Sequence, residues 1–179
     1  FTVEQFIDQQ PFSVYYMTVS GHCRYNQLGN AQSKKNWDLV QHLHYSDGVK
    51  AYIACNLELE KGLTSLVKQL EDAGIADDTV IVIATDHYPY GLTSKEYNEL
   101  AGQEIDTTFG KFRSSFICYN SAMEPVEVET PCCNIDILPT MLNLFGLEYD
   151  SRLITGTDVF SNGNHVAILS NKSCMTYKV

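Results

Sequence analysis

The chain has 179 residues, 44% of them apolar, a size that suits one ordinary domain, or part of one, with a packed core. It carries 12 Lys and Arg against 22 Asp and Glu, a formal charge of −10. This balance argues against a nucleic-acid partner, because phosphate backbones require clustered basic side chains. No stretch approaches the roughly twenty consecutive apolar residues of a membrane-spanning helix, and the first residues lack a signal-peptide pattern. We therefore expect these residues to be soluble, whatever a longer parent protein carries, since the sequence opens on Phe1 rather than Met.

The first element that the sequence predicts is a strand over residues 11–19 (PFSVYYMTV), rich in β-branched and aromatic side chains. It runs into a tight turn at Ser20 and Gly21, and His22 follows directly. The stretch from Lys34 to Tyr45 is polar with scattered aromatic residues, which indicates a loop or a short helix.

A long amphipathic helix follows, with Ser46 or Asp47 as its N-cap and Gly74 after its end. Residues 79–84 (TVIVIA) then form a nearly continuous apolar run, which is typical of a central parallel strand covered on both faces. Asp86 and His87 come just after this run, at the end of a strand where open α/β sheets bind their ligands.

The rest of the chain alternates short helices and strands. Ser94 is expected to cap a short helix through Leu100, without a capping box, because Tyr97 stands where Glu or Gln would be needed. Pro139 places the start or a bend of a further helix, which Gly146 ends. The predicted ranges are strands at 115–119 and 165–169 and a helix within 134–145.

Six cysteines form no C-x-x-C pair, so zinc-finger and knottin frameworks are excluded. The adjacent Cys132 and Cys133 are poorly placed to bridge each other. Cys55 falls in the helical pattern and Cys118 in a strand pattern, so we expect buried free thiols at both positions.

Asp86 and His87 form the strongest chemical signal of the sequence. A carboxylate and an imidazole side by side at a strand end can both reach one divalent cation: oxygen suits Mg or Mn, and nitrogen suits Mn or Zn. The plainer alternative is that Asp86 caps the next turn while His87 packs in the loop.

Three stretches resemble the sulfatase and alkaline-phosphatase superfamily, in the order in which that family carries them. Residues 66–92 (LVKQLEDAGIADDTVIVIATDHYPYGL) are similar to its helix, strand and metal-binding Asp-His, and residues 134–147 with 154–161 resemble its closing helix and glycine-bearing segment. Residues 11–25 (PFSVYYMTVSGHCRY) resemble the strand and His of the lipoteichoic acid synthase branch, the phosphoglycerol transferases. Thr85 stands where a glycine is common, and Cys23-Arg24 is an unusual pairing there.

The resemblance implies an α/β fold with a mostly parallel central sheet flanked by helices, residues 1–179 being the C-terminal part of an incomplete sulfatase-like catalytic domain. It implies that Asp86 and His87 bind the catalytic metal, Mn or Mg with Zn as an alternative, and that His22 lies in the substrate pocket. Lys111 and Arg113 are weaker candidates for contact with an anionic substrate. Tyr88 and Tyr90 are weaker candidates for lining the mouth of the pocket. His42, His44 and His165 are more simply read as structural or solvated.

The same resemblance implies a metal-dependent phosphoglycerol transferase that acts through a covalent intermediate on a phospho- or sulfo-ester, such as lipid-linked glycerol phosphate. The intact protein would be membrane-anchored, at the extracellular face of a bacterial cell membrane. No residue before His22 matches the family's nucleophile, so we expect the 179 residues alone to be inactive. The alternatives are a sulfatase or phosphoethanolamine transferase of the same fold, or a non-catalytic binding module.

Overall fold

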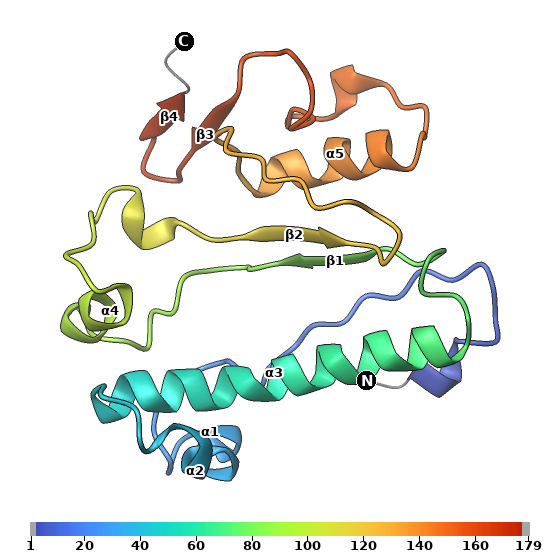
Figure 1. The fold of residues 1–179 in the computed structure, drawn as a ribbon. Helices are drawn as coiled ribbons and strands as arrows, with labels where there is room; N and C mark the ends of the chain where they lie inside the picture. Colours follow the sequence, from blue (N-terminus) through green and yellow to red (C-terminus); the bar gives the residue numbers. More distant parts are fainter. Residues whose placement is uncertain (1–2, 177–179) are drawn as a thin grey trace. The chain divides into compact units, whose positions relative to one another are not determined.

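The computed structural model describes residues 3–176, which divide into two compact units at the boundary between Ala122 and Met123. Figure 1 shows the helices and strands of each unit. The units are described one at a time.

The long helix α3 (Asp47–Asp72) organises the first unit. Gly74 follows its C-cap, and its φ of 70° is the left-handed conformation that glycine adopts readily. Two short helices, α1 (Ala31–Lys35) and α2 (Trp37–Val40), pack against α3. The stretch from Lys34 to Tyr45, which was predicted to be a loop or a short helix, therefore contains the end of α1 and the whole of α2. A short 3₁₀ helix, η1 (Val3–Gln5), precedes these elements.

The first unit contains one sheet of two strands, β1 (Ile81–Ala84) and β2 (Phe116–Tyr119). They pair antiparallel, with Ile81 opposite Tyr119 and Ala84 opposite Phe116. Both strands were predicted, but the sheet differs from the mostly parallel one that was expected, since both ladders among residues 3–176 are antiparallel. β1 is also not covered on both faces, because Val82 is 41% exposed while Ile81 and Ile83 are half-buried.

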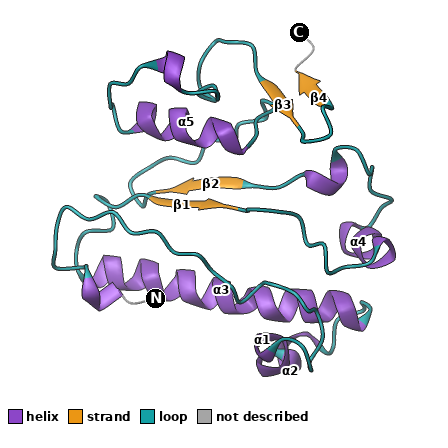
Figure 2. Cartoon of the chain, turned by 180° about the vertical axis from the view of Figure 1, so that it is seen from behind, coloured by secondary structure: helices purple, strands orange, loops and turns teal. Residues whose placement is uncertain are grey.

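The strand predicted at residues 11–19 is wrong: the segment forms no ladder and runs as a loop (Figure 2). Phe12 packs against the core near the end of α3, while Tyr15, Met17 and Val19 are 85%, 78% and 72% exposed. The physical reason is that β-propensity describes a fit to a pleated, half-buried surface, and no neighbouring strand offers that surface to this segment.

Helix α4 (Ser94–Ala101) begins at the residue predicted as its cap, so the N-cap lies one residue earlier, and the expectation that the helix lacks a capping box was wrong. Thr93 is the N-cap: its hydroxyl accepts from the backbone N–H of Glu96, and the Glu96 carboxylate accepts from the Thr93 N–H at 2.8 Å. The helix ends at Gly102, with φ of 68°, and a 3₁₀ turn, η2 (Gly110–Phe112), precedes β2.

The main hydrophobic core of the first unit lies between α3 and the segments that flank it. Val3, Leu66 and Leu70 form its buried centre, and Phe6, Phe12 and Ile81 are among the side chains packed around them. This packing fixes β1, and with it the residues that follow Ala84, relative to α3.

The second unit is built on α5 (Ile137–Leu144), preceded by η3 (Asn134–Asp136) and closed by Gly146, as predicted. The hydroxyl of Thr140 donates to the carbonyl of Asp136 and accepts from the N–H of Val159, while the Asp136 carboxylate accepts from the N–H of Thr157 at 2.7 Å. These bonds hold the segment after η4 (Ser151–Leu153) on the helix. The antiparallel hairpin of β3 (Val166–Ile168) and β4 (Cys174–Thr176) completes the unit, and only β3 was predicted.

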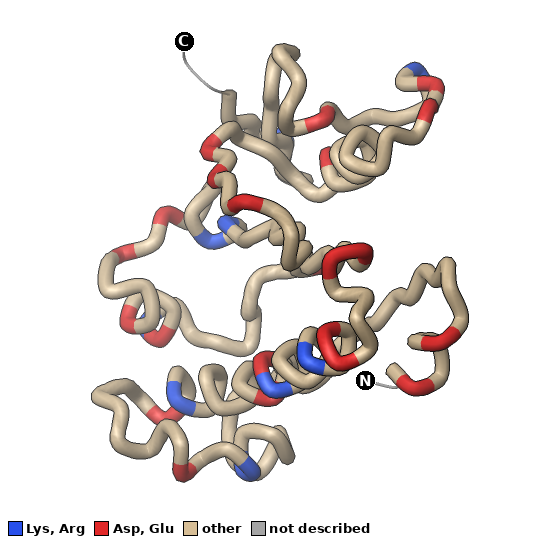
Figure 3. Tube along the Cα trace, turned by 45° about the vertical axis from the view of Figure 1, so that its right-hand side comes forward, with Lys and Arg blue, Asp and Glu red and all other residues tan. Residues whose placement is uncertain are grey.

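Charges are dispersed along the described chain rather than gathered into a stripe, as Figure 3 shows for the interleaved basic and acidic positions of α3. All six cysteines are free, with Cys55 buried and Cys118 half-buried. Within residues 3–176, every helix is too short or too polar to cross a lipid bilayer.

Candidate metal and substrate site

Two loops of the first unit carry the residues that the sequence singled out. One follows β1 and contains Asp86 and His87; the other follows the extended segment and contains His22. The rings of His22 and His87 are 6.0 Å apart, centroid to centroid, although the residues are far apart in the sequence. The structure therefore brings all three predicted site residues together.

Asp86 and His87 present their ligand atoms toward each other, with Asp86 Oδ2 and His87 Nε2 3.5 Å apart. The other ring nitrogen of His87, Nδ1, lies 2.8 Å from the carbonyl oxygen of Tyr88. A carbonyl oxygen only accepts, so in the neutral imidazole Nδ1 carries the proton and Nε2 keeps its lone pair. The side chains of Asp86 and His87 are 87% and 37% exposed, so both groups are accessible.

His22 is held by a chain of polar contacts that includes Cys23 and Tyr90. The Tyr90 hydroxyl lies 3.1 Å from His22 Nε2, and His22 Nδ1 lies 3.3 Å from the Cys23 carbonyl oxygen. Nδ1 is accordingly the donor, and Nε2 accepts from the tyrosine. The Cys23 thiol donates to the Tyr90 hydroxyl, with Sγ and Oη 3.9 Å apart.

The pKa of Tyr90 is raised above its ordinary value, first by the hydrogen bond with Cys23, then by desolvation and by the charges of Cys23 and Asp86. Tyr90 consequently stays protonated near neutral pH and remains a donor to His22. Its ring lies 4.7 Å from that of His87, so Tyr90 contacts both histidines of the site.

The His22 loop is anchored by Asn30, which is only 9% exposed. Its side-chain N–H groups donate to the carbonyl oxygens of Ser20 and His22, at 3.2 and 2.8 Å. Its side-chain oxygen caps α1 by accepting from the backbone N–H groups of Gln32 and Ser33. One side chain thus joins the loop to the helix.

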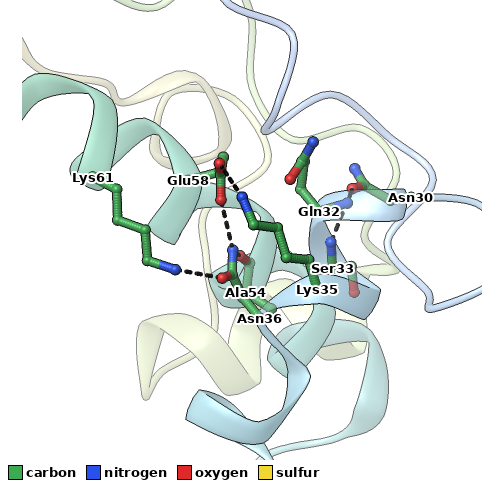
Figure 4. A network of polar contacts seen from close by, with 8 residues as sticks. All are labelled: Asn30, Gln32, Ser33, Lys35, Asn36, Ala54, Glu58 and Lys61. Atoms are coloured by element: carbon green, nitrogen blue, oxygen red, sulfur yellow. Dashed lines mark hydrogen bonds and ion pairs between the residues drawn. The ribbon is translucent and has the colours of Figure 1, made fainter.

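A polar network centred on the buried Asn36 then joins α1 and α2 to α3 (Figure 4). Asn36, 2% exposed, donates to the carbonyl oxygen of Ala54 at 3.0 Å and accepts from the Lys61 ammonium at 2.5 Å. Glu58 accepts from Lys35 at 2.7 Å, and the hydrogen bonds from Lys35 and Asn36 lower the pKa of this carboxyl group. The path from α3 to His22 is therefore a continuous set of hydrogen bonds and helix backbone.

The two loops approach each other closely at Gly91. A Cβ atom there would lie 2.8 Å from the ring of Tyr25 and 2.9 Å from the Cβ of Cys23, closer than packed side chains allow. Tyr25 itself stacks edge-to-face on Tyr52 of α3, with centroids 5.1 Å apart, and burial raises its pKa. The absence of a side chain at position 91 is what lets the two loops meet.

A divalent cation fits the Asp86–His87 pair as a partial ligand set. Metal–oxygen and metal–nitrogen bonds are about 2.0–2.2 Å long, so donor atoms 3.5 Å apart can share one ion. The bond from His87 Nδ1 to the Tyr88 carbonyl is the kind of outer contact that orients a ligating imidazole. Within residues 3–176, however, no group of three or more His, Cys, Asp or Glu side chains is placed to hold a metal ion together.

The weaker candidates lie in different places. Lys111 contacts the face of Tyr88, with its ammonium 4.3 Å from the ring centroid, so this pair adjoins the site. His42 and His44 are exposed in the turn after α2, and His165 belongs to the second unit, where Nε2 lies 2.9 Å from the Ser161 carbonyl oxygen.

Asn30 and Cys23 were not singled out by the sequence as parts of the site. An asparagine before AQSKK is an N-cap signal, but it was missed because that stretch was not expected to begin a helix.

Comparison with known proteins identifies the family of this chain. The family described as Sulfatase matches residues 2–147. The chain is 27% identical over 164 residues to a lipoteichoic acid synthase of Staphylococcus saprophyticus, covering 88% of this chain and 24% of that protein. It is 25% identical to lipoteichoic acid synthase 1 of Bacillus subtilis, with 86% and 24% covered. The chain thus spans about a quarter of the length of these curated relatives.

The fold matches the crystal structure of the lipoteichoic acid synthase LtaP from Listeria monocytogenes with a TM-score of 0.58 and 22% identity, over 78% of this chain and 38% of that one. The predicted α/β class and sulfatase-like architecture are therefore confirmed. With a family match over most of its length, the chain belongs to the sulfatase family, in the branch that resembles the lipoteichoic acid synthases.

Proposed function

We propose that this chain is part of the catalytic domain of a metal-dependent phosphoglycerol transferase resembling the lipoteichoic acid synthases. The observation that carries the proposal is the approach of Asp86, His87 and His22 from two separate loops, with ligand atoms of the first two 3.5 Å apart. The named relatives are lipoteichoic acid synthases, which favours glycerol phosphate over sulfate esters as the transferred group.

In this proposal Asp86 and His87 hold a divalent metal, Mn or Mg. When bound, the metal supplies positive charge to a phosphoryl oxygen and lowers the pKa of a hydroxyl nucleophile. Asp86 contributes the carboxylate oxygen, and His87 contributes Nε2 because its Nδ1 is engaged with the Tyr88 carbonyl.

His22 would bind the phosphate or the leaving group. Its Nε2 now accepts from the Tyr90 hydroxyl, and an O–H group of the substrate would compete for that position as a donor. Tyr90, kept protonated by its surroundings, would then be free to donate to a phosphate oxygen. The two side chains would thus orient the anion beside the metal ligands.

The full reaction would be a two-step transfer through a covalent enzyme intermediate, on a nucleophile that the 179 residues do not supply. The intact protein would act on a lipid-linked glycerol phosphate at the extracellular face of a bacterial membrane. We expect the 179-residue chain alone to turn over no phosphodiester, so measurable cleavage by the purified chain would contradict the proposal.

Titration with Mn²⁺, followed by calorimetry and by the loss of the free-ion electron paramagnetic resonance signal, tests the metal site. We expect weak, saturable binding that Asp86→Asn and His87→Ala each weaken by more than about tenfold. Asp38→Asn on α2 and His165→Ala are matched controls that should leave the affinity unchanged, because both groups lie outside the site. Equal binding by all five proteins would overturn the assignment.

A further inference from the structure

Cys23 contacts both the ring of His22 and the tyrosine that meets that ring from the other loop. Its carbonyl oxygen lies 3.3 Å from His22 Nδ1, and its Sγ lies 3.7 Å from the same nitrogen. Sγ also lies 3.9 Å from the Tyr90 hydroxyl oxygen, which in turn lies 3.1 Å from His22 Nε2. Cys23 and Tyr90 therefore meet the two ring nitrogens of His22 from opposite sides, and they contact each other.

The hydrogen atoms of these three side chains fit one closed arrangement. Because the Cys23 carbonyl oxygen only accepts, Nδ1 of the neutral imidazole carries the proton, and Sγ accepts from the same N–H as a weaker second partner. The thiol then donates its own proton to the Tyr90 hydroxyl, and the hydroxyl donates to Nε2. Every donor in the arrangement has an acceptor, so the contacts agree on the Nδ1–H form of His22.

The opposite tautomer of His22 satisfies fewer of these groups. With the proton on Nε2, the ring would donate to the Tyr90 hydroxyl, and the Cys23 carbonyl oxygen would face a lone pair in place of an N–H. The carbonyl alone is a weak anchor, however, because 3.3 Å is longer than the range of about 2.7–3.2 Å for an N–H···O bond. The thiol, which contacts both Nδ1 and the tyrosine, supplies the rest of the preference.

Close packing fixes the Cys23 side chain in this position. A Cβ atom at Gly91 would lie 2.9 Å from the Cβ of Cys23, so the loop after β1 runs directly against this residue. Cys23 is half-buried, whereas the neighbouring His22 is exposed. The thiol is thus held beneath the ring that faces solvent. Since the Cys23-Arg24 pairing is unusual for the family, the arrangement distinguishes this chain.

We propose that Cys23 is a positioning residue, whose thiol holds the Tyr90 hydroxyl toward His22 and keeps Nε2 of His22 as a hydrogen-bond acceptor. An accepting Nε2 is met by an O–H group of a substrate and not by an anionic phosphate oxygen, which has no proton to donate. The inference rests on the proposed function in one respect, because that function places His22 against the substrate. The tautomer itself involves neither metal nor substrate.

Ring ¹⁵N spectra of the 179-residue chain, recorded without metal at about pH 8.5, test the inference. An ordinary imidazole, with a pKa of about 6.5, is neutral there, and the shifts of its two nitrogens report the tautomer. We expect the Nδ1–H form of His22 to predominate. Cys23→Ala should lower the ratio of Nδ1–H to Nε2–H by about threefold, the effect of one weak hydrogen bond.

Two variants show whether the thiol acts through its hydrogen bonds. Cys23→Ser should restore the ratio, because a hydroxyl also donates and accepts, and it keeps the Cβ that meets Gly91, as Cys23→Ala does. Cys174→Ala, at an exposed thiol of β4, is the matched control and should change nothing. A Cys23→Ala protein with the unchanged ratio, or a Cys23→Ser protein that behaves like Cys23→Ala, would overturn the positioning role.

Tyr90→Phe tests the relay through the tyrosine hydroxyl. Removing the hydroxyl deprives the thiol of the group through which it reaches Nε2, so Cys23→Ala should alter the tautomer ratio less in Tyr90→Phe than in the parent. An equal effect in both backgrounds would overturn the relay.

Two titrations of the parent complete the test. Sulfate, which has no O–H group, should leave the His22 Nε2 signal unmoved at about pH 8.5, and a saturable shift of that signal would overturn the assignment of an O–H partner. Titration with Mn²⁺ keeps the inference separate from the proposed function. A chain that binds Mn²⁺ but whose His22 tautomer ignores Cys23→Ala would contradict only this inference, and the expected tautomer change in a chain that binds no Mn²⁺ would contradict only the metal assignment.

Discussion

The link between Asn30 and the His22 loop allows a sharp mutational test, Asn30→Asp. The substitution keeps the shape of the side chain and an oxygen that accepts from the N–H groups of Gln32 and Ser33. It removes the two N–H donors that reach the carbonyl oxygens of Ser20 and His22 and places a carboxylate oxygen against them. Since Asp and Asn cap helices about equally well, α1 should keep its cap.

The magnitude follows from the two lost hydrogen bonds. A hydrogen bond contributes about 0.5–1.5 kcal/mol net, and a buried acceptor left unpaired costs about 1–3 kcal/mol. We therefore expect Asn30→Asp to lower the free energy of unfolding by about 2–3 kcal/mol at neutral pH. Urea unfolding can be followed through Trp37, the single tryptophan, which lies on α2 next to this region.

The pH dependence of the free energy of unfolding distinguishes the loss of the two Asn30 donors from a general disruption of packing. The two capping N–H groups favour the charged form of the introduced carboxyl group, whereas the two carbonyl oxygens and the burial of the position disfavour it. We expect the balance to raise its folded-state pKa above the unfolded value of about 3.9. When protonated, the group can again donate one hydrogen bond. The destabilisation should therefore be smallest below about pH 4 and grow as the pH rises through the folded-state pKa.

Asn30→Ser serves as the control, because its hydroxyl still caps α1 but brings no carboxylate. It should destabilise the protein by an amount that does not change with pH over this range. The ring signals of His22 should move in both variants, because both release its backbone carbonyl. An Asn30→Asp protein as stable as the parent at pH 7, with unmoved His22 signals, would refute the reasoning.

Three further predictions concern the rest of the chain. Gly156→Ala should destabilise the second unit by about 1–3 kcal/mol, because a Cβ there would overlap the backbone carbonyl of Ile135; protease susceptibility of residues 123–176 would report the effect. Thr93→Ala should lower the free energy of unfolding by about 1 kcal/mol, measured by denaturant unfolding, because the capping box of α4 is lost. Burial raises the pKa of the Cys55 thiol from 9.0 to about 11, so iodoacetamide at pH 8 should modify Cys174, which is exposed, and spare Cys55. Because the folded state holds this proton more tightly than the unfolded state, the free energy of unfolding should fall as the pH rises from about 9 to 11.

The elements with strong local signals could be predicted from the sequence, and those that depend on neighbours could not. The apolar periodicity and the terminal glycine identified α3, and the apolar run identified β1. The direction of the β1–β2 pair was not encoded in either strand, because a continuous apolar run is also compatible with a two-stranded antiparallel pair. Residues 11–19 show the same limit, since their composition favours a strand but no strand lies beside them in the described chain.

The residues of the candidate site also divide into those with a local sequence signal and those whose role depends on the fold. The Asp86–His87 pair could be found because the two residues are adjacent in the sequence and follow a strand. Tyr90 was noticed only as a candidate for the pocket mouth, and its contact with His22 required the two loops to fold against each other. Asn30 was missed because its role depends on carbonyl groups ten and eight residues earlier, which no local pattern indicates.

The contacts of the two histidine rings give them different capacities, although both lie in one site. His87 is oriented by a backbone carbonyl, so its Nε2 is turned toward the Asp86 carboxylate and available as a ligand. His22 has both ring nitrogens engaged by its own protein, one by the Cys23 carbonyl and one by the Tyr90 hydroxyl. A cation needs a free lone pair, whereas an O–H group of a substrate can donate to Nε2 in place of the Tyr90 hydroxyl. The hydrogen bonds therefore favour His87 as the metal ligand and His22 as the group that meets the substrate, and exchanging the two roles would require both loops to rearrange.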